Sequence, residues 1–171
     1  MLTIPHAVVG AALGSFVVEL PAAPAIAFAA GWASHYVLDK IPHWENIFGK
    51  DIHGYPSGVE LKDVPPIGIA SGIVDVTAAA VIVFLVVQTR GELPIWTSPV
   101  FWGALGGFFP DLIDNIPLVN KVTKYVPGVL IERGFHERNH ISEEARRQVP
   151  TWWGFASQLL VIIVGLYVLL T

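Results

Sequence analysis

Long apolar stretches with almost no charged residues dominate this chain. Residues 1–18, 20–38, 93–110 and 148–171 contain no Lys, Arg, Asp or Glu, and residues 64–89 contain only Asp75. A membrane-spanning helix needs about 20 mostly apolar residues to cross roughly 30 Å of hydrocarbon. The pattern therefore predicts five spans, at roughly 4–19, 23–41, 66–88, 95–114 and 151–170.

The runs are too long and too uniformly apolar for barrel strands, which alternate apolar and polar positions. In lipid only helices and closed barrels satisfy the backbone. The predicted fold is therefore all-α: one membrane-embedded domain, residues 1–171, forming a bundle of about five transmembrane helices. Prolines at 21 and 24 predict a tight turn between the first two spans. Glycines in these spans predict close helix approach, and they are Gly10, Gly14, Gly31, Gly103, Gly106 and Gly107.

Composition agrees with the pattern. The chain of 171 residues is 53% hydrophobic and only 14% charged, whereas soluble domains carry about 25% charged residues. The formal net charge of -4 argues against nucleic acid as a partner, because nucleic-acid binders need a basic face. The absence of cysteine excludes disulfides, thiolate metal ligands and a cysteine nucleophile. The first span lacks a basic leader, so we expect it to be retained rather than cleaved.

The positive charges indicate an orientation. With five spans, the N-terminus, the 42–64 loop and the 115–150 loop share one side, and Arg90 alone marks the other. The basic residues on the first side are Lys40, Lys50, Lys62, Lys121, Lys124, Arg133, Arg138, Arg146 and Arg147. The positive-inside rule makes this side cytoplasmic. We therefore expect an inner-membrane protein with a cytoplasmic N-terminus and a partly helical cytoplasmic loop at 115–150.

The same side collects the histidines and most of the acidic residues. His35 and Asp39 are four residues apart, and Asp111 and Asp114 are three apart directly after the helix-breaking Pro110, so each pair shares a helix face. The remaining candidates are His6 at the start of the first span and the stripe His136, His140 and Glu144 in the loop. Because the predicted topology brings these segments to one membrane face, we expect them to form one site.

A short internal similarity supports this convergence. GWASHYVLDKIP at residues 31–42 aligns without gaps with GGFFPDLIDNIP at residues 106–117. The alignment makes Asp39 and Asp114 equivalent and predicts that they face one another across the bundle.

Imidazole and carboxylate groups without thiolates are the ligand set of catalytic zinc, or of a manganese or iron site. The candidate metal ligands are His6, His35, Asp39, Asp111, Asp114, His136 and His140. We expect one or two divalent ions, with zinc the first choice and manganese the alternative. Two further acidic residues are candidates for a general base or for a group that orients a metal ligand. They are Glu144 in the loop and Asp75 within the third span, where an ionisable group usually marks a site.

The residues that carry this chemistry resemble a known family. IPHAVVGAALGS at the start, SHYVLD at 34–39 and PDLID at 110–114 resemble motifs of the membrane-bound metal-dependent hydrolases of bacteria and archaea. GWASHYVLDKIPH also resembles the histidine–aspartate helix of zinc-dependent phospholipase C, and His140 to Glu144 resembles a later motif of that group. The resemblance implies metal ligation by His35, Asp39, His140 and either Asp111 or Asp114, with His6 as a further candidate.

The first functional hypothesis is a metal-dependent hydrolase that acts on a phosphoester or lipid-linked substrate at the cytoplasmic membrane face. Membrane lipid is then a partner, and a homo-oligomer is compatible with the chain. The alternatives are a proton or cation transporter or channel subunit that uses Asp75 and would need an oligomer, and a membrane scaffold in which the polar cluster serves packing alone.

Overall fold

All regular structure in the described residues is helical, as the apolar pattern predicts. The computed structural model describes residues 1–43, 65–123, 125–139, 144–145 and 148–171. Its helices are α1 (Thr3–Ser15), α2 (Ala23–Leu38), α3 (Pro66–Thr89), the short 3-10 helix η2 (Ile95–Thr97), α4 (Pro99–Asn115), α5 (Pro117–Thr123), α6 (Pro127–Asn139) and α8 (Thr151–Leu170).

Two helices in the described part of the chain are long and apolar enough to cross a membrane. They are α3, with 24 residues, and α8, with 20. The other three expected spans are shorter, because α1 has 13 residues, α2 has 16 and α4 has 17. At 1.5 Å per residue these three helices measure about 20 to 26 Å, less than the roughly 30 Å of a hydrocarbon core. The structure therefore does not confirm a five-span bundle.

The boundaries explain why these helices are short. Helix α1 ends at Ser15, not near residue 19, and residues 16–22 turn into α2 through Ala22, whose φ of 58° is left-handed. Helix α4 begins only at Pro99, because Ile95–Thr97 forms a separate 3-10 turn. The Ser98 hydroxyl caps α4 by accepting from the Phe101 amide at 3.2 Å, which satisfies one of the free amides at a helix start.

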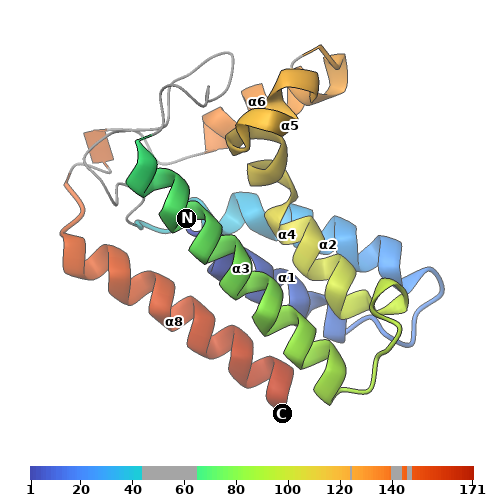
Figure 1. The fold of residues 1–171 in the computed structure, drawn as a ribbon. Coiled ribbons are helices and arrows are strands. Elements are labelled where there is room, and N and C mark those ends of the chain that lie inside the picture. The colour runs from blue at the N-terminus through green and yellow to red at the C-terminus, as the bar shows by residue number, and fades with distance from the viewer. Residues whose placement is uncertain (44–64, 124, 140–143, 146–147) are drawn as a thin grey trace.

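Helix α1 packs against four other helices, α2, α3, α4 and α8. Figure 1 shows α3 and α8 running across the front of the view, α1 behind α3, and α2 and α4 at the right. Helices α5 and α6 lie beyond the C-terminal end of α4, so the expected helical structure within residues 115–150 is present.

Glycines allow α1 and α2 to pack directly on the backbone of α4. A Cβ at Gly31 of α2 would overlap the carbonyl oxygen of Gly103 on α4, and a Cβ at Gly10 of α1 would overlap the same oxygen. Close backbone approach through small residues is typical of helix packing in membranes. The expected close approach is confirmed, and it fixes how the ends of α1, α2 and α4 are placed against each other.

Polar side chains from the two longest helices hold the start of α1. The Asp75 carboxylate on α3 accepts from the amides of Thr3 at 2.6 Å and Ile4 at 3.3 Å, and Gln158 Oε1 on α8 accepts from the Leu2 amide at 2.9 Å. These groups satisfy amides that have no partner inside a helix, and the negative charge complements the helix dipole.

Helix α4 continues through Pro110 to Asn115, so the end of the predicted span at residue 114 agrees with the helix although it contains this proline. Proline provides no N–H for the carbonyl four residues earlier, here that of Gly106. The carbonyl of Gly107, one residue further on, accepts from Nδ1 of His35 on α2 at 2.8 Å. This contact joins α2 to the part of α4 that leads to Asp111 and Asp114 on its last turns.

Candidate metal centre

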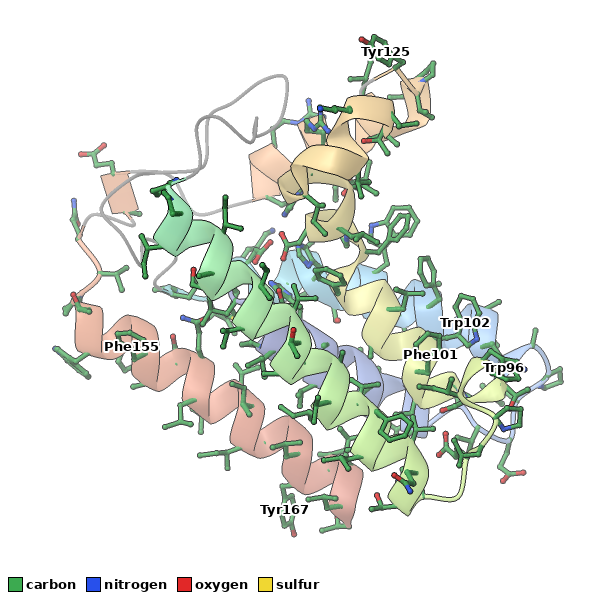
Figure 2. All side chains as sticks on the ribbon, viewed as in Figure 1. Trp96, Phe101, Trp102, Tyr125, Phe155 and Tyr167 are labelled. Carbon is green, nitrogen blue, oxygen red and sulfur yellow. The ribbon has the colours of Figure 1, made fainter. Side chains whose placement is uncertain are left out.

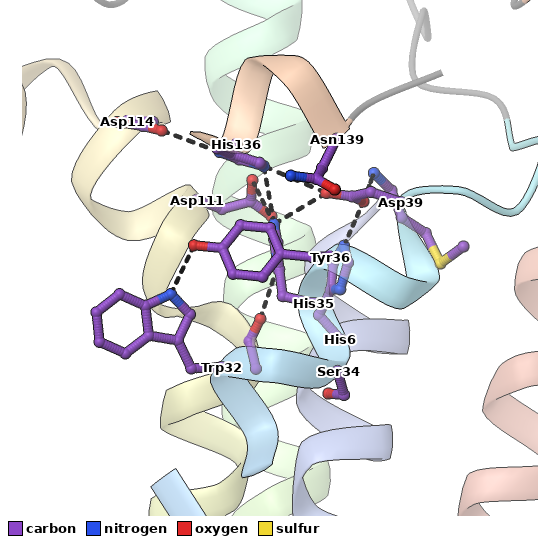
Figure 3. Close-up of polar contacts among 12 residues, drawn as sticks. His6, Trp32, Ser34, His35, Tyr36, Asp39, Asp111, Asp114, His136 and Asn139 are labelled. Atoms are coloured by element: carbon purple, nitrogen blue, oxygen red, sulfur yellow. Dashed lines mark hydrogen bonds and ion pairs between the residues drawn. The ribbon is translucent and has the colours of Figure 1, made fainter. Parts of the chain in front are cut away.

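Four helices bring histidine and aspartate side chains together at one end of the bundle. His6 comes from the first turns of α1, His35 and Asp39 from the C-terminal end of α2, and His136 from α6. Asp111 and Asp114 extend from the end of α4, and Figure 3 shows these groups pointing toward one another. Three overlapping sets of residues have ligand atoms within 4.8 Å of one another: His6, His35 and Asp111; His35, Asp39 and His136; and Asp114, Glu132 and His136.

The tightest set is a triangle of three potential ligand atoms. Nε2 of His35 lies 2.9 Å from Nε2 of His136 and 3.0 Å from Oδ2 of Asp39, and Nε2 of His136 lies 3.2 Å from the same oxygen. All three side chains are buried. Bonds of 2.0–2.1 Å in a tetrahedral zinc site place ligand atoms about 3.3 Å apart. The triangle is therefore close to the size that a small divalent cation needs.

The hydrogen bond of His35 determines which of its nitrogens can bind a metal. Nδ1 lies 2.8 Å from the carbonyl oxygen of Gly107, which can only accept. The proton of the neutral imidazole is therefore on Nδ1, and Nε2 presents its lone pair to the triangle. A second-sphere contact of this kind fixes the tautomer and orientation of metal-binding histidines.

Asp114 orients the His136 imidazole, as the Gly107 carbonyl orients that of His35. Its Oδ2 atom accepts from Nδ1 of His136 at 2.9 Å, and its Oδ1 atom accepts from Nε of Arg133 at 2.8 Å. Nε2 of His136 is thereby directed at Asp39 and His35. The sequence predicts that Asp39 and Asp114 face one another. They do so across His136, because the two carboxylates contact opposite nitrogens of its imidazole.

Without a metal, a proton can occupy the triangle. Burial lowers the pKa of His136, but hydrogen bonds with Asp114 and Asp39 outweigh burial and raise the pKa to about 10. A second proton on Nε2 would donate to Asp39 or to His35. A metal ion must displace this proton, because a ligating imidazole is neutral.

A second group of donors lies on the other side of Asp39. The rings of His6 and His35 are stacked, with centroids 3.9 Å apart, and Nε2 of His6 lies 3.1 Å from Oδ1 of Asp39. The amino nitrogen of Met1 is 3.3 Å from the same oxygen. Asp111 lies 3.9 Å from Nε2 of His35 and is the most exposed of these carboxylates, with 13% of its side-chain surface accessible.

Two polar residues beside the cluster, Glu132 and Arg133, are not among the site residues that the sequence predicts. The Tyr36 hydroxyl donates to Oε1 of Glu132 at 2.7 Å and accepts from Nε1 of Trp32 at 2.7 Å. Burial raises the pKa of Glu132. With Arg133 and His136, Glu132 forms the buried face of α6, at positions i, i+1 and i+4. That helical spacing of polar residues is the signal that would have identified them.

The remaining predicted residues lie elsewhere. Asp75 belongs to none of the three sets and binds the backbone at the start of α1. Glu144 is exposed and also belongs to none of them. His140 lies outside the described residues.

The arrangement offers nitrogen and oxygen donors in a buried setting, with the Asp114 carboxylate and the Gly107 carbonyl orienting the two imidazoles, and these are the features of a metal site. Neither a protein-family model, nor a curated protein, nor a solved structure matches this chain.

Proposed function

We propose that this protein is a membrane-embedded metal-dependent hydrolase that acts on a phosphoester group at the membrane surface. The triangle of His35, Asp39 and His136 carries the proposal, because three potential ligand atoms converge within 3.2 Å. These three side chains would hold a divalent ion, with zinc the first choice and manganese the alternative.

Such an ion lowers the pKa of a bound water and polarises a phosphoryl oxygen. The water oxygen forms a bond to phosphorus, the bond to the leaving oxygen breaks, and the water proton passes to that oxygen. A divalent ion held by these three side chains would keep a coordination position for the water, as catalytic zinc does in other proteins. The Asp111 side of the cluster is the most exposed and is the direction from which water or substrate would approach.

The membrane setting rests on the outer surfaces of α3 and α8. Exposed apolar residues on these helices include Ile73, Val74, Val81, Phe84, Leu159, Leu160, Ile163 and Val164. Aromatic side chains mark both ends of the bundle. Trp96 lies before α4, Trp102 lies in its first turn, and Phe155 lies near the start of α8 (Figure 2). Trp152 is also in the first turn of α8 and is exposed. Aromatic residues are enriched at both membrane interfaces.

A lipid or lipid-linked substrate suits the surface beside the metal centre. Helix α6 turns its buried polar residues Glu132, Arg133 and His136 toward the cluster. Exposed apolar residues lie on α5, on α6 and directly before α6, and they are Val122, Tyr125, Val126, Leu130, Ile131 and Phe135. Lys121 and Arg138 are exposed on the same helices. Apolar side chains combined with basic residues favour the interface of a bilayer that contains anionic lipid. The positive-inside pattern would place this surface in the cytoplasm.

A transporter that uses Asp75 has less support, because both carboxylate oxygens of Asp75 already bind backbone amides of α1. A scaffold without activity has less support as well, because packing alone does not require potential ligand atoms of His35, Asp39 and His136 to lie within 3.2 Å of one another.

Purified full-length protein tests the proposal directly. We expect bound zinc or manganese after purification without chelator, and hydrolysis of a phosphodiester such as bis-(4-nitrophenyl) phosphate and of phospholipid in vesicles. Activity should disappear after chelation and return with the metal. Folded protein that binds neither ion would refute the metal centre, and metal-loaded protein with no activity on any phosphoester would refute the hydrolase.

A further inference from the structure

We propose that the centre holds two cations bridged by Asp39, the second bound by His6, Oδ1 of Asp39 and Asp111. This inference rests on the proposed function, since it adds an ion beside the one held by His35, Asp39 and His136.

The first observation is the state of His6. Its side chain is fully buried. Among the described residues Nδ1 has no hydrogen-bond partner, and Nε2 has only its close contact with Asp39. A buried polar group without a partner is costly and needs an explanation. Its Nε2 atom lies 3.1 Å from Oδ1 of Asp39, close enough for both atoms to bind one ion.

The second observation is the relation between His6 and His35. Their rings are stacked with centroids 3.9 Å apart and 23° between the planes, and each presents Nε2 to a different oxygen of Asp39. Ions in two-metal sites lie about 3.5–4 Å apart. Two parallel imidazoles at this spacing, facing the two oxygens of one carboxylate, match a carboxylate-bridged pair.

Asp111 supplies the third donor to the second position. One of its oxygens lies within 4.8 Å of ligand atoms of both His6 and His35. Because Asp111 is partly exposed, an ion at this position keeps a side open to water or to a phosphoryl oxygen. Two ions would then stabilise the attacking and the leaving oxygen of the displacement.

The amino group of Met1 competes for this position, since it lies 3.3 Å from Oδ1 of Asp39. An ion bound to Oδ1 would replace this contact. The protein binds one ion fewer when the Met1 amino group occupies this position than when a second ion does. The number of ions can be measured without an activity assay.

The test uses full-length protein in detergent, stripped with chelator and dialysed against Mn²⁺. Elemental analysis should give two manganese ions per chain, and electron paramagnetic resonance should show an exchange-coupled pair. His6→Gln should reduce the content from two ions to one and abolish the coupling, and Asp111→Asn provides a second variant should the first fail to fold. His43→Gln is the matched control, because His43 is a buried histidine outside all three ligand sets, and it should keep both ions.

The outcomes separate this inference from the proposed function. One uncoupled ion in the wild type, two uncoupled ions, or retention of both coupled ions by folded His6→Gln would each overturn the bridged pair and leave a single-ion hydrolase standing. Protein that binds no manganese and no zinc would overturn both.

Discussion

Nε2 of His35 lies 2.9 Å from Nε2 of His136, although 101 residues separate them in the chain. Each ring has its other nitrogen engaged, His35 with the Gly107 carbonyl and His136 with Asp114. The two remaining nitrogens therefore face one another and can hold one positive charge between them, either a shared proton or a metal ion bound by both.

Removal of a ligand from the triangle should abolish metal binding. We expect His35→Ala to lose more than about 100-fold in zinc affinity, because loss of a ligand exceeds the effect of losing its orienting partner. Isothermal titration with zinc measures this effect. Lys40→Ala is the control, since Lys40 is exposed and directly follows Asp39 in sequence. Unchanged zinc affinity in folded His35→Ala would contradict the assignment of this ligand.

Asp114 should act through His136. Asp114→Ala removes the acceptor that holds Nδ1, and second-sphere changes of this type cost about 10–100-fold in metal affinity. We expect weaker binding with the number of ions unchanged. Competition with a chromogenic chelator measures the affinity. A loss of one whole ion would show instead that Asp114 is itself a ligand.

The glycine contacts of α4 should be essential to the fold. Gly31→Ala places a Cβ against the backbone carbonyl of Gly103, which cannot move aside as a side chain can. Overpacking costs about 1–3 kcal/mol, so the melting temperature should fall. Gly72→Ala on α3 is the matched control, because a Cβ at Gly72 has no atom within 4 Å. Equal melting temperatures for the two variants would contradict the tight packing.

Asp75 should contribute to stability rather than to ion conduction. Asp75→Ala leaves the amides of Thr3 and Ile4 without their acceptor, a loss comparable to a helix cap at about 1–2 kcal/mol. We expect a lower melting temperature. In proteoliposomes, the wild type should show no proton or cation flux for this change to remove. Flux that Asp75→Asn abolishes would favour the transporter.

The stability of metal-free protein should fall at high pH. The pKa of His136 rises from 6.5 to about 10 in the folded state. A histidine whose pKa is raised by folding stabilises the folded state fully when the pH is below its pKa in the unfolded chain. This stabilisation is lost as the pH rises through the pKa of the folded state. The melting temperature of chelator-treated protein should therefore fall as the pH rises from about 6.5 to about 10. His136→Gln should flatten this part of the profile, and an identical drop in that variant would assign it to another group.

The apolar runs were sufficient to predict the helices but not their lengths. Residues 66–89 and 151–170 form single long helices close to the predicted ranges, because no proline or charge cluster interrupts them. The first and fourth predicted spans were too long, since local hydropathy does not distinguish a helix from the turns at 16–22 and 95–97.

By itself, the sequence determined the helical class, the apolar surfaces of α3 and α8, and the collection of histidines and aspartates at one end, because these follow from local periodicity and spacing. The tertiary structure decided which of those residues meet. It separated Asp75 from the cluster, brought Glu132 and Arg133 beside it, and directed two imidazoles at one carboxylate. Side-chain direction and tautomer depend on contacts between helices distant in the chain, such as that of His35 with Gly107, and no local pattern encodes them.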